Sequence, residues 1–427
     1  MKITDITAIQ ILDSRGNPTI KASVQVGTVA GDFSVPSGAS TGTFEALELR
    51  DHKKGFSGLG VEKAIQNIDT LIKPALIGME ITNQKAIDGK MISLDGTANK
   101  SKLGANAILG VSGAVARAAA KSLNLPLYRY LKNIYEQNGV WEPSVRMDKY
   151  SYKLPKMFFN ILNGGKHAEN QLDIQETMIV PQDDKASENV RIGSEVYHCL
   201  KEIVKGRNLS TGLGDEGGFA PDLESNTKAL DLVAEAIEKA GYKLGKDVCM
   251  ALDVAASEIY DPNTDEKYIL ASENIGLSAM QMVSLYKDLV ANYQVISIED
   301  GLAEEDWDGW QMMTERIGKE VQLIGDDLFV TNVERIKKGI ELNAGNSVLI
   351  KMNQIGTLTE TFEAIRLALK NNYKIMISHR SGETDDSFIA DLSVAVNAGQ
   401  IKSGAPARGE RTSKYNRLIE IEKEIAR

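Results

Sequence analysis

The sequence has very little cysteine: only Cys199 and Cys249 occur among 427 residues. One disulfide could not hold together a chain of this length, so we expect reduced thiols and a cytoplasmic protein. The sequence also lacks any apolar run long enough to span a membrane, and residues 1–10 lack the pattern of a signal peptide. Membrane insertion is therefore not expected. A cell-surface or secreted fraction that arrives without a signal peptide is not excluded.

Positive charge is in deficit, because 49 Lys and Arg face 59 Asp and Glu, for a net charge of −10. This balance argues against nucleic acid and anionic membranes as partners, but a local group of cations or metal ions could still bind an anionic substrate. Hydrophobic residues make up 42% and charged residues 25%, which is typical of a folded soluble protein. The length predicts two or three domains, unless one domain is a large barrel.

The N-terminal part has the pattern of an α+β unit. Residues 3–12 and 19–26 read as paired strands around a cluster of turn-forming residues at 13–18. Helical patterns follow near 61–71, 83–91 and 104–123, and the last of these is rich in alanine. A polar stretch containing glycine and proline follows at about 138–151. We therefore predict an α+β N-terminal domain over residues 1–138 and a second domain over residues 139–427.

The second part alternates short apolar runs with helical stretches, which favours a (β/α)8 barrel. The predicted strands are residues 154–160, 172–180, 248–253, 294–299, 322–326, 347–351, 374–378 and 400–402. Only about a dozen residues separate the first two strands, too few for a crossover helix. The barrel is therefore expected to begin with an antiparallel hairpin.

Polar residues end most of these strands: Asp253, Glu299, Asp326, Lys351, His379 and Lys402. After the first, they are spaced by about one βα unit, so they should meet at the carboxyl rim of the barrel, where active sites of this fold lie. Three converging carboxylates would repel one another unless a cation neutralised them, and oxygen ligands suit Mg²⁺. Helix capping and surface charge remain the alternatives for any single acid.

The basic residues of this rim have two interpretations each. Burial and nearby cations would lower the pKa of Lys351 and make it a general base, or it pairs with an acid for structural reasons. Lys402 has the same interpretations and could also hold a substrate anion. Arg380 could bind phosphate or carboxylate through its planar fork, or be a solvated loop residue.

Three glycine-containing loops add polar groups. Residues 214–221 contain Asp215 and Glu216, and Glu216 could share a proton with Glu176, so that one of the two stays protonated as an acid. Residues 163–168 form a second loop, after the first barrel strand. Residues 37–42 read either as a lid over an anionic site or as a surface turn.

Together these stretches resemble the enolase family across nearly the whole chain. The motifs that carry the resemblance are LDSRGNPT (12–19), SGASTG (37–42), NGGKHA (163–168), GDEGGFAP (214–221), LDVAASE (252–258), SIEDGLAEEDW (297–307), GDDLFVTN (325–332), LIKMNQIGTLTET (349–361), SHRSGETDD (378–386) and GQIKSGAPARGER (399–411). The resemblance implies a barrel of the order ββαα(βα)6 behind an α+β capping domain. It also implies reversible Mg²⁺-dependent dehydration of 2-phosphoglycerate to phosphoenolpyruvate, by a homodimer or a higher oligomer.

The resemblance implies two Mg²⁺ per active site, with Asp253, Glu299 and Asp326 holding the first. The second would arrive with substrate and bind Ser40 in the 37–42 loop. Such ions would stabilise the charge that develops on the substrate carboxylate. A Lys or His base working beside Mg²⁺ is a known feature of sites of this superfamily.

The remaining roles also follow from the resemblance. Lys351 is expected to remove the C2 proton, and Glu216 to protonate the departing 3-hydroxyl with Glu176 as its partner. His167 is expected near the leaving group. The expected substrate-binding residues are Gln175, His379, Arg380, Ser381 and Lys402.

The sequence departs from the family pattern at three places outside these positions: Phe44, Leu59 and Lys166. They bear on the dynamics of the 37–42 loop rather than on the type of reaction. Two alternatives remain: abstraction of an α-proton from a different carboxylate, and a binding protein that keeps the fold without catalysis.

Overall fold

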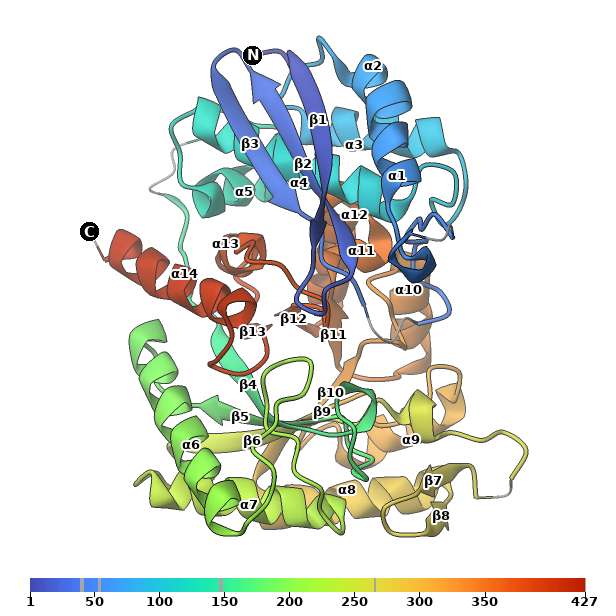
Figure 1. Cartoon of the computed structure of the whole chain (residues 1–427), viewed down its shortest axis with the longest axis vertical. Helices are drawn as coiled ribbons and strands as arrows, with labels where there is room; N and C mark the ends of the chain where they lie inside the picture. The colour runs from blue at the N-terminus through green and yellow to red at the C-terminus, as the bar shows by residue number, and fades with distance from the viewer. Residues whose placement is uncertain (39–41, 53–54, 146–148, 265, 427) are drawn as a thin grey trace.

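A computed structural model of the chain describes all residues except 39–41, 53–54, 146–148, 265 and 427. Its N-terminal part is a three-stranded antiparallel sheet with helices packed against it (Figure 1). The strands are β1 (Asp5–Leu12), β2 (Pro18–Val26) and β3 (Val29–Ser34). The helices are α1 (Glu62–Asn67), α2 (Lys73–Leu76), α3 (Gln84–Asp95), α4 (Ala105–Ser122) and α5 (Leu127–Glu136), with a π-helical turn, η2 (Ile68–Ile72), between α1 and α2.

The alanine-rich helix α4 packs directly on the sheet because its side chains are small. Gly31 of β3 lies so close to the backbone of Ala114 and Ala118 that a Cβ atom would not fit there. Gly113 lies against the ring of Phe33 in the same way. The predicted strands and helices of this part are present, whereas β3 was not predicted.

The C-terminal part is a closed eight-stranded barrel, which confirms the predicted fold class. Its strands are β4 (Lys156–Asn163), β5 (Glu176–Pro181), β6 (Val248–Asp253), β9 (Val295–Glu299), β10 (Gln322–Gly325), β11 (Ser347–Ile350), β12 (Lys374–Ser378) and β13 (Gln400–Lys402). Strand β5 runs antiparallel to both neighbours, and the other pairs are parallel. The barrel therefore begins with the predicted hairpin.

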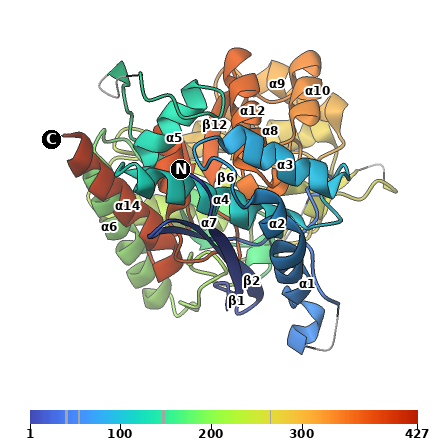
Figure 2. The ribbon, with the colours of Figure 1, turned by 90° about the horizontal axis from the view of Figure 1, so that it is seen from above.

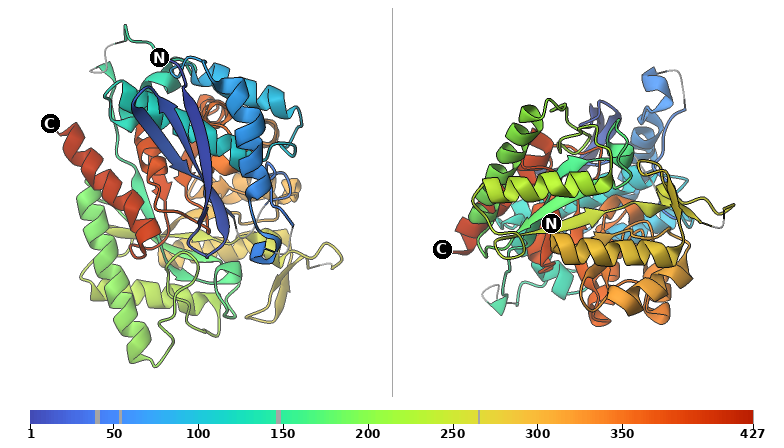
Figure 3. Two further views of the ribbon diagram at one scale, coloured as in Figure 1. Left: turned by 45° about the horizontal axis from the view of Figure 1, so that its top comes forward. Right: turned by 90° about the horizontal axis from the view of Figure 1, so that it is seen from below.

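Two helices follow β5, which completes the predicted ββαα start. The barrel helices are α6 (Ala186–Gly206), α7 (Asn226–Lys239), α8 (Ala279–Tyr293), α9 (Trp307–Ile317), α10 (Val333–Leu342), α11 (Met352–Ile355), α12 (Leu358–Lys370), α13 (Phe388–Ala395) and α14 (Gly409–Ile425). A small hairpin of β7 (Tyr268–Leu270) and β8 (Ile275–Leu277) precedes α8. Figure 3 shows α14 running beside α6 on the outside of the barrel. Within the described part of the chain, no helix is long and apolar enough to cross a membrane.

The interior of the barrel is a packed core rather than a channel. Seven inward-facing side chains form a hydrophobic cluster of their own: Phe158, Met178, Val180, Ala251, Ile324, Leu349 and Met376. Polar side chains can therefore gather only at the ends of the barrel.

The N-terminal elements lie over one end of the barrel, as Figure 2 shows from above. Ser37 pairs with Gly382, in the loop that follows β12. Arg117 of α4 donates to Asp386 at 2.6 Å, and Lys100 pairs with Glu360 of α12 at 2.9 Å. These contacts hold the N-terminal part against the carboxyl rim of the barrel. The predicted division at residues 138 and 139 stays a prediction.

Candidate active site

A polar pocket lies at the carboxyl rim, under the N-terminal elements. It is lined by His167, Gln175, Glu176, Glu216, Asp253, Asp326, Lys351, Ser378, His379, Arg380, Ser381 and Lys402. Among these residues, only Ser378 was not predicted from the sequence. Glu299 is fully buried behind the lining and contacts Lys402. Ser40, the predicted ligand of the second Mg²⁺, lies outside the described residues.

The antiparallel direction of β5 explains how Glu176 reaches this rim. Glu176 is the first residue of β5 and faces Asp253, the last residue of β6, which runs in the opposite direction. Asp253 in turn pairs in register with Glu299, the last residue of β9. The first residue of β5 and the last residues of β6 and β9 thus bring the carboxylates of Glu176, Asp253 and Glu299 together at the carboxyl rim of the barrel.

The ammonium group of Lys402 lies among these three carboxylates. Its Nζ is 2.7 Å from Glu299 and 3.3 Å from both Glu176 and Asp253. Burial opposes the charged form of Lys402, but the acids outweigh burial and raise its pKa well above the usual value. Burial, followed by the charge of Asp253, raises the pKa of Glu299.

Asp326 is held by a second set of contacts. Its Oδ2 accepts a hydrogen bond from Lys351, and its Oδ1 accepts one from Gln354 at 2.8 Å. Burial would raise the pKa of Asp326, but Lys351 lowers it. Burial would lower the pKa of Lys351, but the neighbouring acids, Asp326 first and then Glu299, together raise it. The expected lowering of the Lys351 pKa is therefore wrong.

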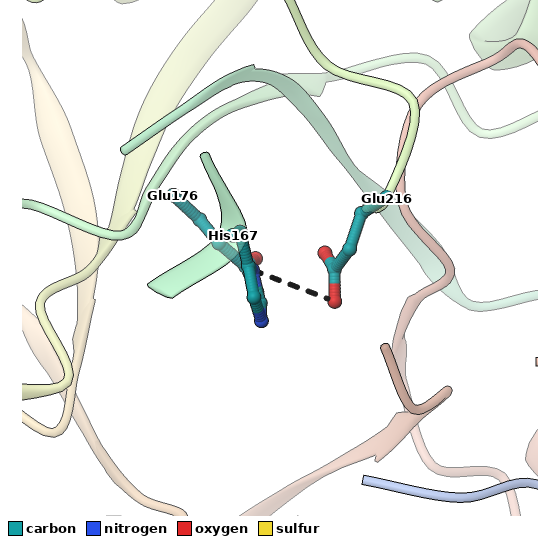
Figure 4. Close-up of side chains that lie close together, drawn as sticks. All are labelled: His167, Glu176 and Glu216. Carbon is teal, nitrogen blue, oxygen red and sulfur yellow. Dashed lines mark ion pairs between the residues drawn. The ribbon is translucent and has the colours of Figure 1, made fainter. Parts of the chain in front are cut away.

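Glu216 and Glu176 face each other across His167, as Figure 4 shows. Nδ1 of His167 is 3.8 Å from a carboxylate oxygen of each, and one potential ligand atom from each of the three residues lies within 4.8 Å of the other two. Burial and the negative charge of Glu216 raise the pKa of Glu176 well above its usual value. Burial alone would raise the pKa of Glu216, but its contact with His379 and the charge of Arg411 lower it. The pair is therefore arranged to hold one proton.

Arg380 is buried and paired with an acid that the sequence analysis missed. Its two Nη atoms donate to the two carboxylate oxygens of Glu45, at 3.0 and 3.1 Å. Glu45 also accepts hydrogen bonds from the backbone of Gly42 and from Gln354. The position of Glu45, three residues after the SGASTG motif, was the available signal.

Two further acids beside Asp326 were also missed. Both oxygens of Asp300 accept backbone N–H groups, from Asp326 at 2.9 Å and from Asp327 at 2.8 Å. Carboxylate oxygens of these three acids lie within 4.8 Å of one another. Asp300 and Asp327 directly follow predicted ligands in the sequence, so they could have been singled out.

The backbone is strained next to the predicted metal ligands. Non-glycine residues with positive φ follow each of the three strands: Ala255 (48°), Asp300 (41°), Val330 (42°) and Thr331 (55°). Such conformations cost on the order of 1–3 kcal/mol each and gather at functional sites. For the β-branched Val330 and Thr331 they are especially unfavourable.

The donor set of this rim fits a hard divalent cation. Asp253, Glu299 and Asp326 offer only carboxylate oxygens, which are the ligands that Mg²⁺ prefers. Oε2 of Glu299 is buried and has no hydrogen-bond partner among the described residues. An acceptor without a donor at such a place is open to a cation.

The fold and this pocket define a barrel protein with buried acids gathered at its carboxyl rim, where their oxygen atoms could hold a metal ion. Residues 3–131 match the family described as "Enolase, N-terminal domain", and residues 151–427 match "Enolase, C-terminal TIM barrel domain". The two matches together span nearly the whole chain. The chain belongs to the enolase family.

Proposed function

We propose that the protein is a phosphopyruvate hydratase, which interconverts 2-phosphoglycerate and phosphoenolpyruvate with Mg²⁺. The observation that carries this proposal is the placement of Lys351 in the same pocket as the Glu176–Glu216 pair, with Arg380 and Ser381 in its lining. A base and an acid pair around one bound molecule are what loss of water from a 2-phosphorylated hydroxy acid requires.

Asp253, Glu299 and Asp326 would hold the first Mg²⁺, and Ser40 would contribute to the second. When bound, these ions supply positive charge beside the substrate carboxylate. Lys351 accepts the C2 proton at its Nζ, for which it must first be deprotonated. Its contact with Asp326 opposes that, so the base form is available only when Asp326 is otherwise neutralised.

Glu216 delivers a proton to the departing 3-hydroxyl, with Glu176 sharing that proton and His167 beside both. Arg380 and Ser381 bind the phosphate, and Gln175, His379 and Lys402 contact or polarise the substrate. The proposal includes a homodimer or higher oligomer in the cytoplasm. Both cysteines are free thiols, which agrees with a reducing compartment.

Ultraviolet absorbance of phosphoenolpyruvate formed from 2-phosphoglycerate tests the reaction. Product should appear with Mg²⁺ and not after chelation with EDTA. Folded protein with Mg²⁺ that forms no product would overturn the proposal. Mg²⁺-dependent exchange of an α-proton on another carboxylic acid would then indicate a different reaction of the same class.

Two variants test the assigned roles. Lys351→Ala should abolish exchange of the C2 proton with solvent while substrate still binds. Glu216→Gln should retain some C2 exchange but lose net dehydration. Equal loss of both activities in Glu216→Gln would argue against Glu216 as the acid.

A further inference from the structure

Arg411 is a fully buried arginine in the first turn of α14, behind the pocket. Its guanidinium group donates to the carbonyl oxygens of Asp215 and Arg380 at 3.1 and 2.6 Å, and to that of Ser381 at 2.5 Å. Its Nη1 also lies 2.6 Å from Nδ1 of His379. One side chain thus contacts both loops that carry Glu216 and His379.

The contact with Arg411 decides where the proton of His379 lies. A guanidinium group has only donors, so Nδ1 of His379 must accept and cannot carry hydrogen. The proton of the neutral ring is then on Nε2, which lies 3.2 Å from Oε1 of Glu216. Burial lowers the pKa of His379 to about 3, so the ring is neutral at physiological pH.

We propose that Arg411 is a positioning residue that locks His379 in the Nε2–H tautomer, so that the imidazole faces Glu216 only as a donor. The proposal rests on the proposed function of Glu216 as the acid. In this tautomer the single lone pair of the ring points at Arg411, so His379 cannot accept the proton of Glu216. That proton is left to Glu176 or to the substrate.

Arg411 also fixes the positions of the two partners. Asp215 immediately precedes Glu216, and Arg380 immediately follows His379, so Arg411 holds the backbone next to both side chains. The guanidinium group of Arg411 therefore sets both the tautomer of His379 and its distance from Glu216. Partners that set the tautomer of a metal-binding histidine typically change activity about 10- to 100-fold when removed. We expect an effect of the same size for Arg411 and His379.

The tautomer can be observed directly by ¹⁵N NMR of protein labelled at histidine. The chain has only four histidines, and His379→Gln assigns the signals of interest by their loss. In the unaltered protein, Nδ1 of His379 should have the shift of an unprotonated nitrogen and Nε2 that of a protonated one. A proton on Nδ1, or rapid exchange between the two forms, would overturn the proposal.

Arg411→Met tests the cause of this tautomer. We expect a proton on Nδ1 in part of the population and a fall in kcat of about 10- to 100-fold. The matched control is Lys414→Met, which removes another buried lysine or arginine of α14. Lys414 contacts Glu383 and Thr384 in the loop after β12, which also carries His379, but it does not contact His379 itself. This control variant should lower the melting temperature and leave the tautomer unchanged.

An Arg411→Met protein that folds and keeps the Nε2–H tautomer would show that Arg411 is only structural. If this variant does not fold, a proton on Nδ1 of His379 in the unaltered protein would still overturn the proposal. The tautomer is measured without turnover. A protein with the expected spectrum but no dehydration would therefore contradict the proposed function and not this inference.

Discussion

The ammonium nitrogen of Lys402 lies 2.7 Å from Oε1 of Glu299, so a lysine of the last barrel strand neutralises a predicted metal ligand. Asp253, a second predicted ligand, contacts the same nitrogen at 3.3 Å. Lys402 therefore supplies part of the positive charge that the buried acids require. Mg²⁺ bound by the predicted ligands would act on the same carboxylates as Lys402.

Lys402→Met should destabilise the metal-free protein, because it leaves buried carboxylates without a cation. Breaking a buried pair in this way lowers the free energy of unfolding by about 3–5 kcal/mol. Added Mg²⁺ should restore more stability to the variant than to the unaltered protein, since the ion replaces the lost charge. Urea unfolding with and without Mg²⁺ measures both effects.

Lys100→Met is the control for this prediction. Lys100 is also a buried lysine paired with an acid, Glu360, but it lies at the interface with α12. This variant should lose stability without any larger response to Mg²⁺. An equal Mg²⁺ response in Lys402→Met and the unaltered protein would contradict the prediction.

Glu45 occupies the planar fork of Arg380 that a substrate phosphate is proposed to use. Glu45→Gln removes a negative charge that would repel the phosphate, while it keeps an acceptor for Arg380. We expect the KM for 2-phosphoglycerate to fall by up to about tenfold, which corresponds to about 1.4 kcal/mol. Steady-state kinetics measure this change.

Glu48→Gln serves as the comparison, because Glu48 is a neighbouring acid that pairs with Arg50. Its KM should change less than that of Glu45→Gln. A rise in KM for Glu45→Gln would mean that the carboxylate orients Arg380 for phosphate rather than competing with it.

Asp300 fixes the backbone of a predicted metal ligand, since its carboxylate accepts the N–H groups of Asp326 and Asp327. Asp300→Ala leaves both N–H groups without their acceptor and frees the loop after β10. The dissociation constant for Mg²⁺ should rise roughly 10- to 100-fold, as for other partners that orient metal ligands. Calorimetric titration with Mg²⁺ measures it, with the exposed Asp308→Asn as control. Unchanged Mg²⁺ affinity in Asp300→Ala would exclude this role.

The sequence was sufficient to predict the barrel and the polar residues that end its strands, because both follow from regular spacing. The positions of His167, Gln175 and Ser381 in the pocket were expected only from the resemblance to the family. Strands recurring once per βα unit place their last residues at one rim, and Asp253, Glu299 and Lys402 lie there. The short interval before the second strand also predicted the antiparallel start. Glu176 reaches the rim only because that strand is reversed.

What the sequence could not predict depends on contacts between distant segments. Glu45 meets Arg380 across the two parts of the chain, and nothing in the local pattern near either residue indicates the other. The pKa of Lys351 was predicted to be lowered but is raised, for the same reason. It depends on Asp326, whose distance from Lys351 only the folded barrel determines.

Asp88 of α3 links the N-terminal part to the barrel from a fully buried position. Its Oδ2 accepts hydrogen bonds from the backbone and hydroxyl of Thr359 at the start of α12, and its Oδ1 accepts one from Gln84. Burial outweighs these hydrogen bonds and raises the pKa of Asp88 from its ordinary value of 3.8 to about 6. The folded protein therefore binds a proton here more tightly than the unfolded chain does.

Because of Asp88, the free energy of unfolding should fall as the pH rises from about 4 to about 6 and then level off. The loss that Asp88 contributes is at most about 3 kcal/mol in the free energy of unfolding. The asparagine of Asp88→Asn cannot ionise, so the free energy of unfolding of this variant should not fall in this way. In the control variant Asp69→Asn, which changes an exposed residue, the fall should remain. Urea unfolding at a series of pH values across this range measures the difference. The same pH dependence in Asp88→Asn and the unaltered protein would show that Asp88 does not titrate in this window.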